Sequence, residues 1–298
     1  MTPKSKNNIN NSKPKGEITH VAVVTGSSSG IGFETALTLA RNGFYTYATM
    51  RNLEKSKNIT EIANTEKLPL QVVQLDVNDD RSVKDAIDKI VAENKRIDLL
   101  VNNAGYGLFG SLEDISIEEI KAQFETNFFG VIRVTQQVLP IMRKQNSGGT
   151  IVNVSSVGGR IGVPVLSAYQ STKFALEGLS ESMSYELEPF GIRVVIIEPG
   201  FIRTNIINSS ALAEKALDSK SPYFPLMQKV KNHFKSMMEN ASSSSPPEEV
   251  AKVILHAITS ENPQLRYTVG NDAATIIQAR MNMPDKEFRK MVIQNFSL

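Results

Sequence analysis

The sequence predicts an α/β fold in which one doubly wound parallel sheet of about seven strands carries helices on both faces. Short β-branched and apolar runs alternate along the chain with longer stretches of helical spacing. The first of these runs leads directly into a glycine-rich turn and a helix. A chain of 298 residues with 41 % hydrophobic side chains can also bury one large core, as doubly wound domains of this size do.

The expected strands are short and rich in side chains that suit a buried sheet. The first is largely apolar and β-branched from position 20 to 25. The others are separated by helical patterns, which favours parallel pairing. In chain order the expected strands are 21–25, 44–49, 70–75, 98–101, 150–154, 193–198 and 266–269.

Helices are expected between these strands. The helix at 33–42 stops at Gly43, a residue suited to a left-handed cap. Ser245 and Glu248 have the spacing of a capping box, with proline at the first helical position, so they predict the start of a helix that runs to about Thr259. The other expected helices are about 80–93, 117–143 and 168–187.

The glycine-rich turn after the first strand contains Gly26, Gly30 and Gly32, with the spacing GxxxGxG. Glycines allow a pyrophosphate to approach the backbone, and the N-terminus of the following helix attracts its charge. This context predicts a Rossmann-type dinucleotide site, and a purely structural turn is the alternative. The chain has no GxxxxGK(S/T) motif, which disfavours a P-loop nucleotide hydrolase.

Three later residues can form a reaction site for an alcohol or a carbonyl group. Tyr169 and Lys173 are four positions apart, so on a helix they lie on one face. A free phenol has a pKa of about 10, which leaves it about 4 kcal/mol short of acting as a base at neutral pH. An ammonium group about 4 Å away stabilises the deprotonated phenol by about the same amount. Ser156 can then hydrogen-bond the substrate oxygen. The alternative is an exposed helix that carries an aromatic side chain and a cation.

Together these motifs resemble the classical branch of the short-chain dehydrogenase/reductase family. The similarity runs from about residue 21 to 204, with a weaker tail to about 273. Ser156 and Tyr169 are thirteen positions apart, as they are in the family. The matching residues are Thr25, Gly26, Gly30, Ile31, Gly32, Leu75, Asp76, Val77, Asn102, Asn103, Ala104, Gly105, Asn127, Ser156, Tyr169, Lys173, Pro199, Gly200 and Thr204.

The resemblance implies catalytic roles for four residues. Tyr169 would be the acid/base, and Ser156 would orient the substrate, so both are expected to contact it. Lys173 would hold the nicotinamide ribose and lower the pKa of Tyr169. Asn127 would complete a proton relay through water.

The resemblance also implies a set of cofactor contacts. Asp76 would bind the adenine ring, Asn103 would lie where the cofactor packs against the sheet, and Thr204 would hold the nicotinamide carboxamide. The full expected set is Gly26, Ser28, Gly30, Ile31, Gly32, Arg51, Asp76, Val77, Asn103, Gly105, Tyr169, Lys173, Pro199, Gly200, Ile202 and Thr204.

The end of the second strand predicts a preference for NADP(H) over NAD(H). No acidic residue is available there to bind the adenosine ribose, and Arg51 lies nineteen positions after Gly32. A guanidinium group matches the geometry of a 2′-phosphate with paired hydrogen bonds. The alternative is that Arg51 is a solvated loop charge and either cofactor is accepted.

The chain divides into a tail and one domain. Residues 1–16 are polar, lack the apolar stretch of a signal peptide and predict a disordered tail. Residues 17–298 are expected to form a single Rossmann-type domain. Within it, residues 205–245 interrupt the alternation, and by resemblance they would cover the substrate pocket. Amphipathic helices packed on the fold are an equally weighted interpretation of this insert.

Composition argues against several other classes of function. The chain has no cysteine, which excludes disulfides and thiolate catalysis and suits the cytoplasm. A net charge of +2 gives no reason to expect nucleic acid or a membrane as a partner. The three histidines lack metal-ligand spacing, so no metal site is expected. By resemblance, a homodimer or homotetramer would pair the helices at 117–143 and 168–187.

The expected function is hydride transfer between NADP(H) and a secondary alcohol, ketone or aldehyde. The segments 103–108 and 266–270 resemble a sub-branch that contains hydroxysteroid and retinol dehydrogenases, and would place Tyr106 and Leu108 at the pocket entrance. An apolar small-molecule substrate is expected from the Phe, Tyr and Met residues of the insert. The alternatives are an NADP(H)-binding redox sensor and a sugar epimerase or dehydratase of the wider family.

Overall fold

Seven parallel strands form the central sheet of the computed structural model, which describes residues 20–204, 210–239 and 244–298. The predicted fold class is confirmed, and each expected strand is present with small shifts at its ends. The strands are β1 (Val21–Val24), β2 (Tyr45–Met50), β3 (Leu70–Gln74), β4 (Leu99–Asn102), β6 (Gly149–Val154), β7 (Ile192–Pro199) and β9 (Arg266–Val269). The predicted tail, residues 1–16, lies outside the described residues.

The strand order β3-β2-β1-β4-β6-β7-β9 determines where a ligand crevice is expected. We call the edge of the sheet at the carboxyl ends of its strands the functional edge. The chain first moves outward from β1 to β3, then crosses back and continues from β4 in the opposite direction. The order therefore reverses between β1 and β4, which pair in parallel through Ala22 and Leu99. In open α/β sheets a ligand crevice lies at such a reversal, beyond the carboxyl ends of the strands.

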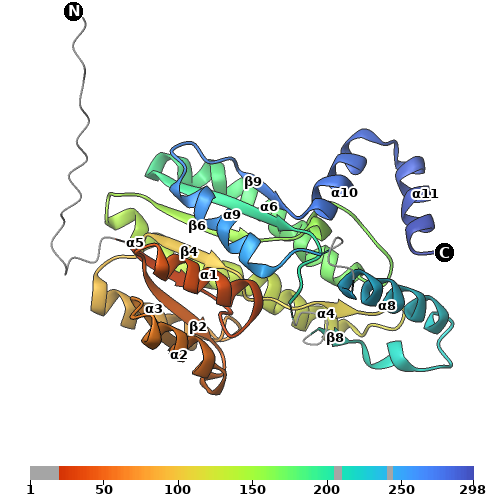
Figure 1. Cartoon of the computed structure of the whole chain (residues 1–298), viewed down its shortest axis with the longest axis horizontal. Coiled ribbons are helices and arrows are strands. Elements are labelled where there is room, and N and C mark those ends of the chain that lie inside the picture. Colours follow the sequence, from red (N-terminus) through yellow and green to blue (C-terminus); the bar gives the residue numbers. More distant parts are fainter. Residues whose placement is uncertain (1–19, 205–209, 240–243) are drawn as a thin grey trace, which may run out of the picture.

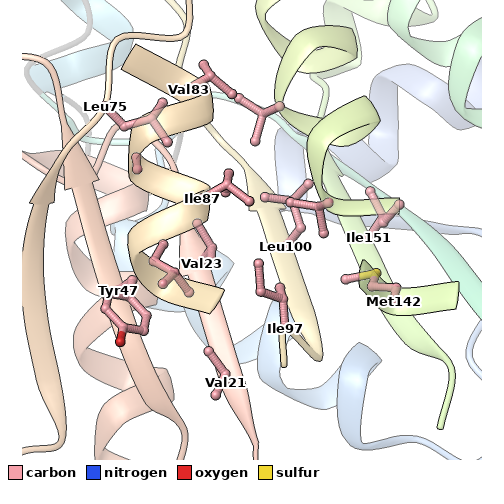
Figure 2. Packing of buried hydrophobic residues seen from close by; sticks show 14 of the residues in the cluster. Val21, Val23, Tyr47, Leu75, Val83, Ile87, Ile97, Leu100, Met142 and Ile151 are labelled. Atoms are coloured by element: carbon pink, nitrogen blue, oxygen red, sulfur yellow. The ribbon is translucent and has the colours of Figure 1, made fainter. Parts of the chain in front are cut away.

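Helices cover both faces of the sheet (Figure 1). One face packs against α1 (Gly30–Arg41), α2 (Lys57–Thr65) and α9 (Pro247–Thr259). The other packs against α3 (Asp80–Asn94), α5 (Gly130–Lys144) and α6 (Ser167–Leu187). Figure 2 shows this second layer, where Ile87 of α3 and Met142 of α5 lie over Leu100 and Ile151 of the strands. Burial of side chains on both faces explains why the central strands β1 and β4 are almost entirely apolar.

The long helix expected at 117–143 is divided in the structure. It consists of α4 (Ile117–Phe124), a π-helical turn (Glu125–Phe129) and α5. The wider turn lies at Asn127, whose side chain is buried and bonded to the neighbouring loop. Apolar periodicity does not reveal one extra residue in a turn, so the prediction missed this break. Turns of this kind are frequent at functional sites.

The start of α9 also differs from the prediction. The residue before the helix is Pro246, and no side chain caps it, so the expected capping box of Ser245 and Glu248 is wrong. Ser245 instead forms a parallel bridge with Ile202, in which its N–H donates to the Phe201 carbonyl at 2.9 Å. Extended pairing with the segment after β7 therefore replaces helix capping at this serine.

The insert and the C-terminus form a third apolar cluster beside the sheet. A second, two-stranded sheet pairs β5 (Leu108–Phe109) with β8 (Ala211–Leu212). Helix α8 (Phe224–Glu239) contributes Met227 and Val230 to the cluster, and Phe296 follows α11 (Asp285–Asn295) into it. Helix α10 (Asn271–Asn282) connects β9 to α11. Figure 1 shows α8, α10 and α11 together at one end of the molecule. Residues 205–209 and 240–243 of the insert lie outside the described residues.

Two negative findings apply to the described residues. Among them, no helix combines the length and apolar character needed to cross a membrane. The same residues contain no group of three or more His, Cys, Asp or Glu side chains that could hold a metal ion.

A buried chain of polar side chains fixes the two central strands to their helices near the functional edge. Asn102 donates to Asn153 at 2.9 Å and to Thr135 at 3.0 Å. Asn153 donates to Ser180 of α6 at 2.8 Å. Because these groups are buried, each depends on its protein partners for hydrogen bonds.

We predict that Asn153→Ala lowers the free energy of unfolding by about 1–3 kcal/mol, because it leaves buried polar partners unsatisfied. Urea denaturation followed by circular dichroism measures this loss. Asn58→Ala, at an exposed position of α2, is the control and should change stability by less than about 0.5 kcal/mol. Equal stability of the two variants would contradict the proposed role of the buried polar side chains in stabilising the fold.

Candidate active site

Four strand ends bring the predicted site residues to one edge of the sheet. The glycine turn follows β1, Asn103 follows β4, Ser156 follows β6 by two positions, and Pro199 ends β7. Three close approaches join these segments. Two glycines closely approach neighbouring segments. A Cβ atom added to Gly26 would lie only 2.8 Å from Ala104 Cα, and one added to Gly30 would lie 3.2 Å from Thr204 Cγ2. The Ser156 hydroxyl lies 3.5 Å from the Pro199 carbonyl oxygen.

The glycine turn has the properties that a dinucleotide pyrophosphate requires. Gly26 and Gly30 adopt positive φ angles of 68° and 59°, which favour glycine. Ser29 precedes α1 without a capping side-chain hydrogen bond, and the first turn of α1 contains no acidic residue. The first N–H groups of the helix are therefore free to bind an anion. Ser28 lies in the same turn and is partly exposed. These residues fit a bound dinucleotide.

Thr25 and Asn103 hold the glycine turn in place. The Thr25 hydroxyl oxygen accepts hydrogen bonds from the N–H groups of Asn103 and Ala104, both at 3.0 Å. The Asn103 side chain donates back to the carbonyls of Thr25 at 2.9 Å and Gly26 at 3.1 Å. Asn103 therefore connects the turn after β1 to the loop after β4.

Arg51 lies beside the same turn, as the sequence predicts. Thr49, two residues earlier, accepts a backbone hydrogen bond from Ser27 at 2.9 Å. The Arg51 side chain is exposed and makes no hydrogen bond or ion pair to another described residue. The Arg51 carbonyl accepts from Gln74 at 3.1 Å, which brings the end of β3 close by. A guanidinium at this position is available to an anionic ligand.

Other predicted cofactor residues have structural contacts of their own. The Asp76 carboxylate accepts from the Asn78 N–H at 3.0 Å, and the Val77 carbonyl accepts from Arg133 at 2.6 Å. Ile31 and Ile202 belong to the apolar cluster under α1 and α9. These contacts support the segments that carry the predicted cofactor residues.

The three proposed reactive side chains lie together. Lys173 lies one turn after Tyr169 on α6, with its ammonium nitrogen 5.8 Å from the centre of the phenol ring. The ammonium donates to the Val154 carbonyl at 2.8 Å, so it connects α6 to the end of β6. A Cβ on Gly158 would lie 3.4 Å from both the Ser156 oxygen and the Tyr169 ring. The serine hydroxyl and the phenol therefore face the same small space.

Burial dominates the acid–base properties of this group. It raises the pKa of the Tyr169 phenol, and the hydrogen bond with Ser156 acts in the opposite direction. The predicted lowering of the Tyr169 pKa by Lys173 stays a prediction. Burial also lowers the pKa of Lys173 to about 8, against the opposing charge of Glu177.

Asn127 supports the loop that carries Gly105. From the π-helical turn its side chain accepts from the Tyr106 N–H at 3.0 Å and donates to the Tyr106 carbonyl at 2.9 Å. It also donates to the Thr172 hydroxyl at 3.2 Å, next to Lys173. The predicted proton relay through this residue stays a prediction.

Asp272 is a site residue that sequence reasoning missed. Its carboxylate accepts from the Phe201 N–H at 2.6 Å, and a Cβ on Gly200 would lie 2.4 Å from it. Burial raises the pKa of Asp272, and the Phe201 N–H opposes this rise. The carboxylate thus holds the segment from Pro199 to Thr204 against α10. The only sequence signal is an acid in the first turn of α10, which does not reveal its distant partner.

Phe234 of the insert connects three segments beside the site. Its ring stacks on Phe201 at 5.8 Å between centroids and contacts Phe109 edge-on at 5.7 Å. It also lies 6.0 Å from Phe296 near the C-terminus. Leu108, expected at the pocket entrance, is instead buried in this cluster, and Tyr106 is partly exposed. The described part of the insert therefore packs on the fold through helix α8, which brings the Phe234 ring beside Phe201.

Sequence comparison establishes the family. The sequence model of the short chain dehydrogenase family matches residues 20–215, which include the glycine turn and the Ser156, Tyr169 and Lys173 group. The chain belongs to this family, and it is an oxidoreductase by that membership.

Curated relatives extend the similarity over almost the whole chain. The uncharacterized oxidoreductase YusZ of Bacillus subtilis is 40 % identical over 268 residues, covering 89 % of this chain and 94 % of the relative. Human 17-beta-hydroxysteroid dehydrogenase type 1 is 35 % identical over 272 residues, covering 89 % of this chain and 81 % of the relative.

Solved structures show the same architecture. A short-chain dehydrogenase from Streptomyces avermitilis has a TM-score of 0.78 and 31 % identity, covering 94 % of this chain and 96 % of that protein. A metagenomic short-chain oxidoreductase solved with NADP has a TM-score of 0.66 and 25 % identity, covering 84 % of this chain and 96 % of that protein.

Proposed function

We propose that this protein transfers a hydride between NADP(H) and an apolar secondary alcohol, ketone or aldehyde. The observation that carries this proposal is the placement of Ser156, Tyr169 and Lys173 at the sheet edge that also holds the glycine turn. The bound nicotinamide supplies or accepts the hydride. The protein orients the two reactants and moves the proton on the substrate oxygen.

Each reactive side chain has a distinct task in this proposal. The Ser156 hydroxyl and the Tyr169 phenol hydrogen-bond the substrate oxygen. Because burial raises the pKa of Tyr169, the phenol is protonated at neutral pH and can donate its proton to a carbonyl. In the reverse direction the deprotonated Tyr169 phenolate takes the proton of the alcohol. The Lys173 ammonium stabilises the negative charge that develops on the phenol oxygen, and it would hold the nicotinamide ribose of the bound cofactor.

The preference for NADP(H) rests on Arg51. Its exposed guanidinium follows β2 beside the glycine turn, where a dinucleotide bound at that turn would place its adenosine ribose. A charged hydrogen bond to a 2′-phosphate stabilises binding more than a contact to a ribose hydroxyl does. The metagenomic relative solved with NADP supports the same choice.

An apolar substrate is supported by the aromatic rings beside the site. Phe109, Phe201 and Phe234 present apolar surface next to the segment that ends β7. The human relative is named for a hydroxysteroid, a secondary alcohol on an apolar skeleton.

Exposed apolar side chains support a homodimer or homotetramer. Phe129, at the start of α5, is 47 % exposed, and Phe174 and Tyr185 of α6 are 48 % and 67 % exposed. These helices are the ones expected to pair with a second copy. Large apolar side chains gathered on two neighbouring helices favour such a contact.

We predict that Tyr169→Phe lowers kcat for ketone reduction by at least about 100-fold, because the proton donor is lost. Cofactor fluorescence should show that NADPH affinity changes by less than about twofold, since the ring is kept. Retention of most of the activity would show that another group moves the proton.

We predict that the native protein uses NADPH with a higher kcat/KM than NADH and that Arg51→Asp reverses this preference. Loss of a charged hydrogen bond should lower kcat/KM with NADPH by about 10- to 100-fold. Arg289→Asp on α11 is the matched control, since it makes the same charge change at an exposed, distant position. A native preference for NADH would overturn this assignment of Arg51.

A further inference from the structure

Lys173 lies beside a cluster of buried and half-buried charges that extends from α6 to the far edge of the sheet. The cluster contains three cations and three acids, so its formal charges cancel. Its members are Arg160, Lys173, Glu177, Glu181, Glu198 and Arg266. Buried charges are stable only when they are paired in this way.

Arg266 of β9 organises the acidic members of the cluster. Its Nε lies 3.0 Å from Glu177 Oε2, and its Nη2 lies 2.5 Å from Glu181 Oε2, both on α6. The same Nε lies 3.6 Å from Glu198 Oε1 of β7. Arg160 contacts that Glu198 oxygen at 2.8 Å from the loop after β6. Charged groups from three elements and one loop thus meet around α6.

Glu177 is the member that connects this cluster to the reactive residues. It follows Lys173 by one helical turn, as Lys173 follows Tyr169. Only 6 % of Glu177 is exposed. A Cβ on Gly159 would lie 2.9 Å from Glu177 Cγ, 2.8 Å from the Ser155 hydroxyl and 3.1 Å from the Lys173 carbonyl. The Glu177 side chain therefore lies at Gly159, beside the Lys173 backbone and the Ser155 hydroxyl that precedes Ser156.

Burial shifts the pKa of Lys173 and the pKa of Glu177 in opposite directions, and in each case it disfavours the charged form. Burial lowers the pKa of Lys173 to about 8, and the Glu177 carboxylate raises it. Burial raises the pKa of Glu177, while the Ser155 hydroxyl and then Arg266 act against this rise and Glu198 adds to it. Arg266 therefore helps to keep Glu177 ionised, and the ionised Glu177 helps to keep Lys173 charged.

We propose that Glu177, held by Arg266, is a positioning residue that keeps the Lys173 ammonium charged beside Tyr169 and the cofactor site. This inference rests on the proposed function, since it assigns Lys173 a role in catalysis and in holding the nicotinamide ribose. Glu181 lies one turn further along α6 and shares the contact with Arg266, whereas Glu177 is the carboxylate that raises the pKa of Lys173. The alternative is that the whole cluster only stabilises the fold.

The test compares Glu177→Gln with Glu181→Gln, which make the same chemical change at neighbouring turns. We measure kcat for ketone reduction and the Kd of NADPH, by cofactor fluorescence, between pH 6 and 10. In the native protein both should worsen as the pH rises through about 8, where Lys173 loses its proton. Because Glu177 raises the pKa of Lys173, E177Q should move both transitions about one pH unit lower. E181Q should leave them in place, and E177D, which keeps the carboxylate, should restore the native profiles.

The outcomes separate this inference from the proposed function. If kcat and the Kd of NADPH change at the same pH in E177Q as in the native protein, while Tyr169→Phe abolishes turnover, the inference is wrong. Activity in the Tyr169→Phe protein would instead overturn the proposed function. If E177Q does not fold, Glu177→Ser is the second neutral variant and should show the same shift. Failure of both neutral variants to fold, with E181Q folded, would make Glu177 a structural residue and also overturn the inference.

Discussion

The hydrogen bond from the Lys173 ammonium to the Val154 carbonyl is the contact on which the candidate active site depends. It joins the helix that carries Tyr169 to the strand that leads to Ser156. This contact fixes the helix that carries the phenol against the end of the strand from which the chain continues to the serine hydroxyl. The parallel sheet places the glycine turn at the same edge, because all its strands end on one side.

Burial of the Lys173 ammonium has two opposing electrostatic consequences. A buried ammonium interacts strongly with neighbouring charges, since little water screens it. The same burial favours loss of its proton, and the nearby Glu177 carboxylate opposes that loss. The cluster around Arg266 therefore has a functional consequence in addition to its stability, because it determines the pH range in which Lys173 is charged. The raised pKa of Tyr169 has the same origin and keeps the phenol protonated as a proton donor.

Local patterns in the sequence were sufficient to predict the seven strands, the glycine turn and the proximity of Ser156, Tyr169 and Lys173. Each of these features depends on residues close together in the chain, and their shared edge follows from parallel topology. Contacts between distant segments were not predictable in this way. Asp272 meets Phe201, Arg266 meets Glu177, and β5 pairs with β8, all across long separations. The π-helical turn at Asn127 changes the helix by a single residue, which leaves apolar periodicity almost unaltered. The rise in the pKa of Tyr169 through burial was not predictable from the motif, because the extent of burial is a property of the whole fold.

The fate of the hydride tests the central claim most directly. The protein is incubated with NADPH that carries deuterium at C4 of the nicotinamide, together with a series of ketones from small to steroid-sized. Mass spectrometry then locates the label in the products. Hydride transfer at this site predicts one deuterium on the carbinol carbon of an apolar alcohol, with the hydroxyl proton drawn from solvent. Tight NADPH binding with no deuterium in any product would contradict the account and favour a protein that only senses the cofactor.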